Sequence, residues 1–182
     1  CDPQAAAAIV VDGSFFGRID QHIIGNYIHN FGNNGCNQHS AITHGSSGSV
    51  VNNVVLGAPS NGIQLWHDAN RILIANNTVL NSGVGILVGS GDYYQPPAPA
   101  DYIKVINNLV AFNLTWGIRE EGLTGANNLY SSNLTFGQPN NWSLQNGLID
   151  SRTILSNPLF VNYQTDGSGD LHLTAGSPAR DA

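Results

Sequence analysis

The amino-acid sequence predicts an all-β protein that folds as a right-handed parallel β-helix, a solenoid with an internal asparagine ladder and a C-terminal capping segment. Two phrases that recur along the chain, together with a low content of charged residues, support this prediction. Charged residues make up only 10% of the chain, where about 25% is usual in globular domains. Recurring phrases are the signature of a repeat protein, in which each repeat buries its apolar side against the next.

The first phrase is a short apolar run that passes through one or two asparagines into a second apolar pair, as in IKVINNLV at 103–110. An asparagine at a turn tolerates the left-handed backbone conformation and can hydrogen-bond its own backbone. Stacked asparagines are therefore expected to form a ladder inside the solenoid. The asparagines taken as equivalent, separated by 27, 24, 31 and 20 residues, are Asn26, Asn53, Asn77, Asn108 and Asn128.

The second phrase is an isoleucine that follows a small residue, glycine in three of its four copies. Its isoleucines, separated by 21, 23 and 32 residues, are Ile42, Ile63, Ile86 and Ile118. Three short strands separated by turns make one coil, and stacked coils pair their backbones about 4.8 Å apart. Both phrases therefore predict coils of roughly 20 to 24 residues that are interrupted by loop insertions.

Alternation along these strands predicts which side chains point inward and which point outward. The four isoleucines are expected to stack inward, in register. The outward row beside them is Thr43, Gln64, Leu87 and Arg119, and the next outward row is Gly45, Trp66, Gly89 and Glu121.

The length of 182 residues predicts one domain, residues 1–182, with regular coils over about 10–130 and the last coil and C-terminal cap over 131–182. The net charge is −6, and no run of lysine or arginine could neutralise a phosphate backbone, so nucleic acid is not an expected partner. No apolar stretch approaches the length of a membrane span. The abundance of Asn, Ser, Thr, Gln and Gly suits an extracellular protein, secreted or held at the cell surface.

The two cysteines, Cys1 and Cys36, leave three interpretations open. They form one disulfide that ties down the N-terminal end, they are two free buried thiols, or Cys1 carries a lipid. Because the chain begins at Cys1 and contains no methionine, it is also expected to be a processed protein.

On these phrases, the chain resembles the pectate-lyase-like family of right-handed parallel β-helices over about residues 10–130. The tail, residues 157–162 and 169–182, is similar to the closing segment of many secreted bacterial β-helix proteins. The resemblance implies an asparagine ladder between the second and third strands of each coil and a substrate groove on the first sheet. It also implies extracellular action on a polysaccharide, although the family includes lyases, hydrolases, epimerases and non-catalytic surface proteins.

A polysaccharide lyase is the first candidate activity. β-Elimination on a uronic acid needs a base at the C5 proton and a cation that stabilises the carboxylate as its charge grows. Arg119 is the expected cation, and His67, Arg71 and Lys104 are candidate bases. Ca²⁺ is a candidate cofactor, with Asp68, Asp92 and Glu121 as candidate ligands. Alternatively, Arg119 simply pairs with a surface carboxylate.

A glycoside hydrolase is the second candidate activity, because it needs two carboxyl groups about 5 to 9.5 Å apart. Glu121 with Asp92 or Asp68 meets that requirement if neighbouring coils bring them together. Alternation sends Glu120 inward, where an unpaired carboxylate would be costly. The strand is therefore expected either to end at Arg119 or to provide Glu120 with a partner.

Substrate contacts are expected from Gln64, Trp66, Asp92, Tyr93 and Tyr94, because aromatic faces beside a sheet suit stacking on sugar rings. Two alternatives to an enzyme remain open. The first is a non-catalytic glycan-binding or surface-adhesion module that uses the same aromatic side chains. The second is a structural solenoid that self-associates end to end through its open sheet edges.

Overall fold

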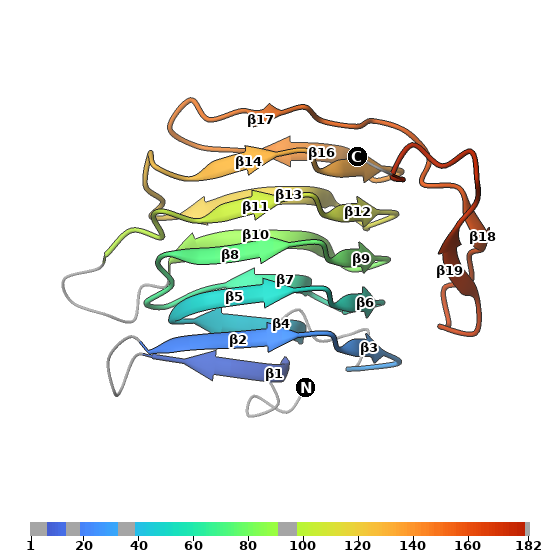
Figure 1. Cartoon of the computed structure of the whole chain (residues 1–182). Coiled ribbons are helices and arrows are strands. Elements are labelled where there is room, and N and C mark those ends of the chain that lie inside the picture. Colours follow the sequence, from blue (N-terminus) through green and yellow to red (C-terminus); the bar gives the residue numbers. More distant parts are fainter. Residues whose placement is uncertain (1–6, 14–18, 33–38, 91–97, 181–182) are drawn as a thin grey trace.

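The computed structural model describes residues 7–13, 19–32, 39–90 and 98–180. Within these ranges the protein is all-β and contains no helix. Three long sheets of parallel strands run side by side, and a short antiparallel hairpin lies outside them. In Figure 1 the second sheet is in front, the first lies behind it and the third is at the right.

Each sheet takes every third strand of the chain. The first sheet contains β1 (Ala7–Asp12), β4 (Ser40–Gly45), β7 (Asn61–Leu65), β10 (Val84–Ser90), β13 (Trp116–Gly122) and β16 (Asn140–Ser143). The second contains β2 (Asp20–Ile24), β5 (Ser47–Val51), β8 (Ile72–Ala75), β11 (Lys104–Ile106), β14 (Leu129–Ser131) and β17 (Asp150–Ser151). The third contains β3 (Tyr27–His29), β6 (Val54–Leu56), β9 (Thr78–Leu80), β12 (Leu109–Ala111) and β15 (Leu134–Phe136). Three consecutive strands thus form one coil, an arrangement consistent with a parallel β-helix.

The isoleucine row stacks in the predicted register. Ile42 pairs with Ile63, Ile63 with Ile86, and Ile86 with Ile118, and all four side chains are fully buried. Burying each contributes about 1.5–3 kcal/mol relative to exposure. The same pairing aligns the outward row of Thr43, Gln64, Leu87 and Arg119.

A ladder of asparagines connects consecutive coils between the second and third strands, as predicted. At each step one side-chain oxygen accepts hydrogen bonds from both the backbone N–H and the Nδ2 of the asparagine one coil earlier. Asn77 Oδ1, for example, lies 2.9 Å from Asn53 N and 3.0 Å from Asn53 Nδ2. The ladder residues are Asn26, Asn53, Asn77, Asn108 and Asn133.

The prediction of Asn128 as the last ladder residue is wrong, because Asn133 occupies that position, 25 residues after Asn108. Ladder residues follow a strand of the second sheet, whereas Asn128 precedes β14. The apolar pair after Asn128 belongs to β14 itself, which gives the same local pattern at a different corner of the coil. Asn128 instead accepts a hydrogen bond from Ile103 N and donates to Ala100 O.

The ladder ends on a carboxylate. Asn133 Nδ2 donates to Asp150 Oδ2 at 2.7 Å, and Thr153 donates to the other oxygen at 3.0 Å. Burial raises the pKa of Asp150, although these two hydrogen bonds act in the opposite direction. Asp150 therefore provides the acceptor that a further asparagine would otherwise supply.

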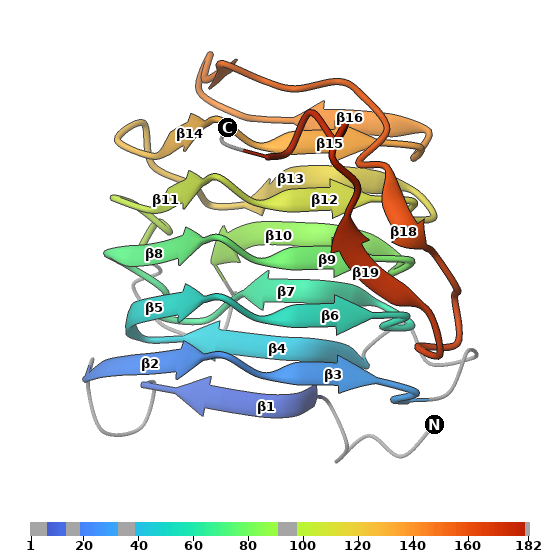
Figure 2. The same cartoon turned by 45° about the vertical axis from the view of Figure 1, so that its right-hand side comes forward.

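The C-terminal hairpin covers the side of the third sheet rather than the end of the stack (Figure 2). Its strands, β18 (Phe160–Asn162) and β19 (Asp170–Leu173), are antiparallel. Leu171 and Leu173 pack on the outward apolar row of the third sheet, which includes Leu56 and Leu80. The tail was expected to form a terminal cap, but this apolar outer row needs to be covered and the tail provides that cover.

We expect the ladder to contribute more to stability than the exposed asparagines beside it. Asn77→Ala removes the side-chain acceptor of Asn53 N–H and the side-chain donor to Val50 C=O, which should lower the free energy of unfolding by about 2–4 kcal/mol. The matched control is Asn76→Gly, since Asn76 is exposed and has a positive φ of 56° that glycine tolerates. Urea denaturation of both variants tests this, and equal losses would contradict it.

Candidate functional site

The outer face of the first sheet carries the strongest candidate site. Strand β13 places Trp116, Arg119 and Glu121 on this face. Arg119 Nη2 lies 3.3 Å from Glu121 Oε2, and its guanidinium carbon lies 5.9 Å from the centroid of the Trp116 ring. The side chains of Arg119 and Glu121 are 35% and 46% exposed, so both reach solvent. The cation thus lies near an aromatic ring on one side and a carboxylate on the other.

Trp66 reaches the same face from the coil that contains β7. A β-carbon added at Gly89 would lie only 2.9 Å from Trp66 Cζ3, so the indole packs directly over Gly89. Gly89 in turn pairs with Glu121 of the next coil. Three members of the predicted outward row, Trp66, Gly89 and Glu121, are therefore neighbours, and Trp66 and Glu121 lie on two sides of a residue without a side chain.

Gln64 completes the face. Its Oε1 accepts hydrogen bonds from Ser40 Oγ at 2.6 Å and from Asn61 Nδ2 at 3.0 Å. These bonds orient the amide and leave its Nε2 without an acceptor among the described residues. We call Gln64, Trp66, Trp116, Arg119 and Glu121 the first-sheet face.

Glu120 is buried between the two exposed residues of this face and has partners, as one of the two sequence interpretations required. Its Oε1 accepts from Tyr130 Oη at 2.7 Å and from Asn128 Nδ2 at 2.9 Å, and its Oε2 accepts from Gln145 N at 2.7 Å. Burial and the neighbouring Glu120 carboxylate raise the pKa of Tyr130 well above its ordinary value. Strand β13 continues to Gly122. The hydrogen bonds of the buried Glu120 hold this part of the strand in place, and with it the flanking residues Arg119 and Glu121.

The structure separates some of the predicted catalytic residues. His67 and Asp68 lie in the turn that follows β7, next to Trp66, and His67 has a positive φ of 53°. Of the two residues proposed as bases beside His67, Lys104 lies on β11 of the second sheet and Arg71 immediately precedes β8 of the same sheet, so neither lies on the first-sheet face. No three His, Cys, Asp or Glu side chains in the described part of the chain are grouped as a metal site would require.

Several predicted residues lie outside the described residues: Asp92, Tyr93, Tyr94, Cys1 and Cys36. Conversely, sequence reasoning missed Trp116. It pairs with Val84 and Asn140 in the first sheet and contacts Arg119. The sequence signal for Trp116 was its position at the start of a predicted strand, three residues before the outward Arg119.

Comparison with protein-family models, with curated proteins and with solved structures gives no match. Within the described residues, no helix is long and apolar enough to cross a membrane. Function is therefore inferred from the arrangement of the side chains themselves.

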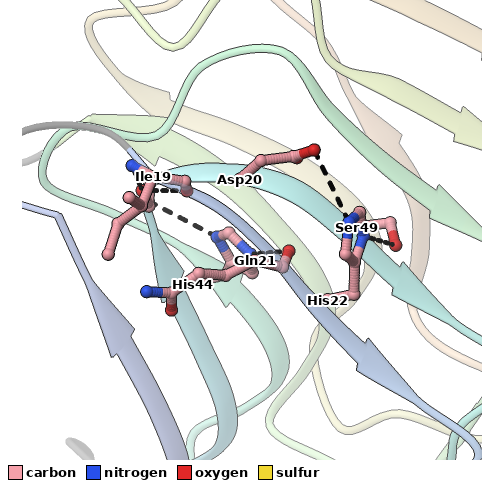
Figure 3. Close-up of polar contacts among 7 residues, drawn as sticks. Ile19, Asp20, Gln21, His22, His44 and Ser49 are labelled. Carbon is pink, nitrogen blue, oxygen red and sulfur yellow. Dashed lines mark hydrogen bonds and ion pairs between the residues drawn. The ribbon is translucent and has the colours of Figure 1, made fainter.

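A buried histidine lies on β4, in the same sheet (Figure 3). His44 is fully buried, and its Nε2 lies 3.1 Å from the carbonyl oxygen of Gln21, to which it donates. Its Nδ1 accepts from Ser46 N at 3.4 Å, so both ring nitrogens are used by the neutral form. His22 and Asp20 lie nearby and contact each other at 3.6 Å.

Acid should destabilise the protein through His44. Burial lowers the pKa of His44 below 6.5, with a smaller contribution from His22, while the Gln21 carbonyl and Asp20 act in the opposite direction. The unfolded chain binds a proton at His44 more readily than the folded protein does. The contribution of neutral His44 to the free energy of unfolding is therefore complete above about pH 6.5 and decreases as the pH falls below 6.5. Unfolding free energies measured between about pH 8 and 5 should decrease more for the wild type than for His44→Gln. Parallel pH profiles would contradict this assignment.

Proposed function

We propose that the chain is a secreted, polysaccharide-active protein and that the first-sheet face holds the glycan. The observation that carries the proposal is the presence of two tryptophans and an Arg–Glu pair on one outer sheet face. Indole rings offer apolar faces on which a sugar ring can stack. Arg119 and Gln64 offer hydrogen-bond donors for its oxygens.

We further propose that the three parallel sheets and the ladder form a right-handed parallel β-helix of the pectate-lyase-like kind, acting outside the cell. Two features support this assignment. The ladder lies between the second and third strands of each coil, and the tryptophans lie on the first sheet, where that resemblance implies a substrate groove.

Lyase chemistry is the activity that we propose first. A uronate carboxylate would replace Glu121 beside Arg119, and the guanidinium would stabilise the added negative charge as a base removes the C5 proton. The electrons of that C–H bond form a double bond between C4 and C5 as the C4–O4 bond breaks, and the leaving O4 takes up a proton from water. His67 and Asp68, which follow Trp66 in the chain, are the candidate bases.

Glycoside hydrolysis is the alternative activity, with Glu121 as one carboxyl group and Asp68 or Asp92 as the other. A non-catalytic glycan-binding module is the alternative without chemistry. The two partly exposed tryptophans, Trp66 and Trp116, support the binding module, because stacking on a sugar ring needs neither an acid nor a base.

Glycan binding should depend on both tryptophans. Trp66→Ala and Trp116→Ala are each expected to weaken binding of a glycan ligand by roughly two- to tenfold, because each removes one stacking surface. The matched control is Trp142→Phe, since Trp142 packs against the core and pairs with Ile118 of the inward row. Titration calorimetry against a panel of polyuronates and neutral glycans measures this. Unchanged affinity in both alanine variants would exclude the first-sheet face.

Activity should depend on Arg119. If the protein is a lyase, incubation with a polyuronate produces the ultraviolet absorbance of unsaturated uronate, and Arg119→Ala lowers that rate by about 100-fold or more. Arg180→Ala, in the exposed C-terminal tail, is the control and should retain the wild-type rate. New reducing ends without absorbance, lost in Glu121→Gln, would indicate a hydrolase. Binding without either product would indicate a binding module.

A further inference from the structure

A groove of about 560 Å³ crosses the outer face of the second sheet. Its lining residues include Gly48 and side chains from the next two consecutive coils, Arg71 and Leu73 from one and Tyr102, Lys104 and Ile106 from the other. Leu73 on β8 pairs directly with Lys104 on β11. None of these residues belongs to the first-sheet face.

Arg71 and Tyr102 occupy equivalent positions in the two coils, and both have unusual backbones. Their φ angles are 55° and 57°, in the left-handed region that large side chains seldom adopt. At the ladder corner of the coil the same conformation is taken by asparagines such as Asn76 and Asn107. Backbone strain of this kind persists where the surrounding structure or a function requires it.

The two side chains form a preorganised pair. The Arg71 guanidinium carbon lies 4.5 Å from the centroid of the Tyr102 ring, a cation–π contact. Such stacking restricts the guanidinium before a ligand arrives and leaves its hydrogen-bond donors available.

The groove concentrates positive charge on a chain of net charge −6 that has only six Lys and Arg residues. The Lys104 ammonium contacts no acid among the described residues. The charges of Asp101 and Arg71 interact, and the carboxylate oxygens of Asp101 accept hydrogen bonds from Asn127 N at 3.0 Å and Asn127 Nδ2 at 2.8 Å. Burial opposes ionisation of Asp101, yet these bonds and Arg71 lower its pKa. Asp101 is therefore ionised and offsets part of the charge of Arg71, while Arg71 and Lys104 together still leave the groove with an excess of positive charge.

We propose that this groove is a second saccharide site, which takes an anionic oligosaccharide. A carboxylate or sulfate group lies between Lys104 and Arg71, and the apolar face of a sugar ring lies against Leu73 and Ile106. Leu73 is 37% exposed and Tyr102 is 47% exposed, so apolar and aromatic surface is available beside the cations. The site shares no residue with the first-sheet face and does not depend on the activity proposed there.

Titration calorimetry of the whole chain tests the proposal with three oligosaccharides of similar length. Pentagalacturonate carries carboxylates, a heparin-derived hexasaccharide carries sulfates as well, and maltopentaose is neutral. The variants are Lys104→Gln and Arg71→Asn, because asparagine tolerates the left-handed conformation while removing the charge. Arg119→Ala is the control for the first-sheet face. Circular dichroism and thermal unfolding show whether each variant folds. If Arg71→Asn does not fold, Lys104→Gln decides the test.

We expect at least one anionic oligosaccharide to bind each groove variant about tenfold more weakly or worse. In Arg119→Ala, the binding of that oligosaccharide to the groove should remain unchanged. Preference for pentagalacturonate would identify carboxylate as the recognised group, and preference for the heparin fragment would identify sulfate. Equal affinity in the wild type and both groove variants overturns the proposal. Complete loss of binding in Arg119→Ala alone also overturns it, as does maltopentaose binding that the groove variants weaken as much as they weaken binding of the anionic oligosaccharides.

Discussion

The stack of coils depends on hydrogen bonds that run from one buried asparagine to the next. Each ladder asparagine accepts from the backbone and the side chain of the coil before it, and donates to the coil after it. A corner of the coil that would otherwise bury unpaired N–H and C=O groups is satisfied in this way. Asp150 accepts the last of these bonds, so the ladder ends on a group that needs no further donor.

Once the ladder sets the stacking of the coils, the pairing of the strands follows, and alternation decides which side chains reach the surface. Ile86 and Ile118 stay inside, and Leu87 and Arg119 lie on the outer face beside them, where Arg119 reaches solvent and Leu87 is covered, with only 6% of its surface exposed. A small residue at one coil makes room for a large one from another, as Gly89 does for Trp66. The buried carboxylate of Glu120 adds a polar anchor between the exposed Arg119 and Glu121.

The few charged side chains of this protein are unevenly distributed over the coils. Arg119 and Glu121 lie with two tryptophans on the first sheet, while Arg71 and Lys104 lie with a tyrosine on the second. Each group combines a cation with an aromatic ring, which suits a ligand that has polar groups around an apolar face. The hairpin covers the apolar outer row of the third sheet, so that face contributes to stability instead.

The all-β class, the isoleucine row and four of the five ladder positions were predictable from the amino-acid sequence, because they depend on phrases that recur from one coil to the next. The sequence did not distinguish Asn133 from Asn128, since both are followed by apolar residues. The contact of Trp116 with Arg119, the stacking of Arg71 on Tyr102 and the position of the tail along the third sheet are visible in the tertiary structure alone. Such contacts join residues whose alignment depends on the whole coil and its loop insertions, and the length of those insertions differs from one coil to the next.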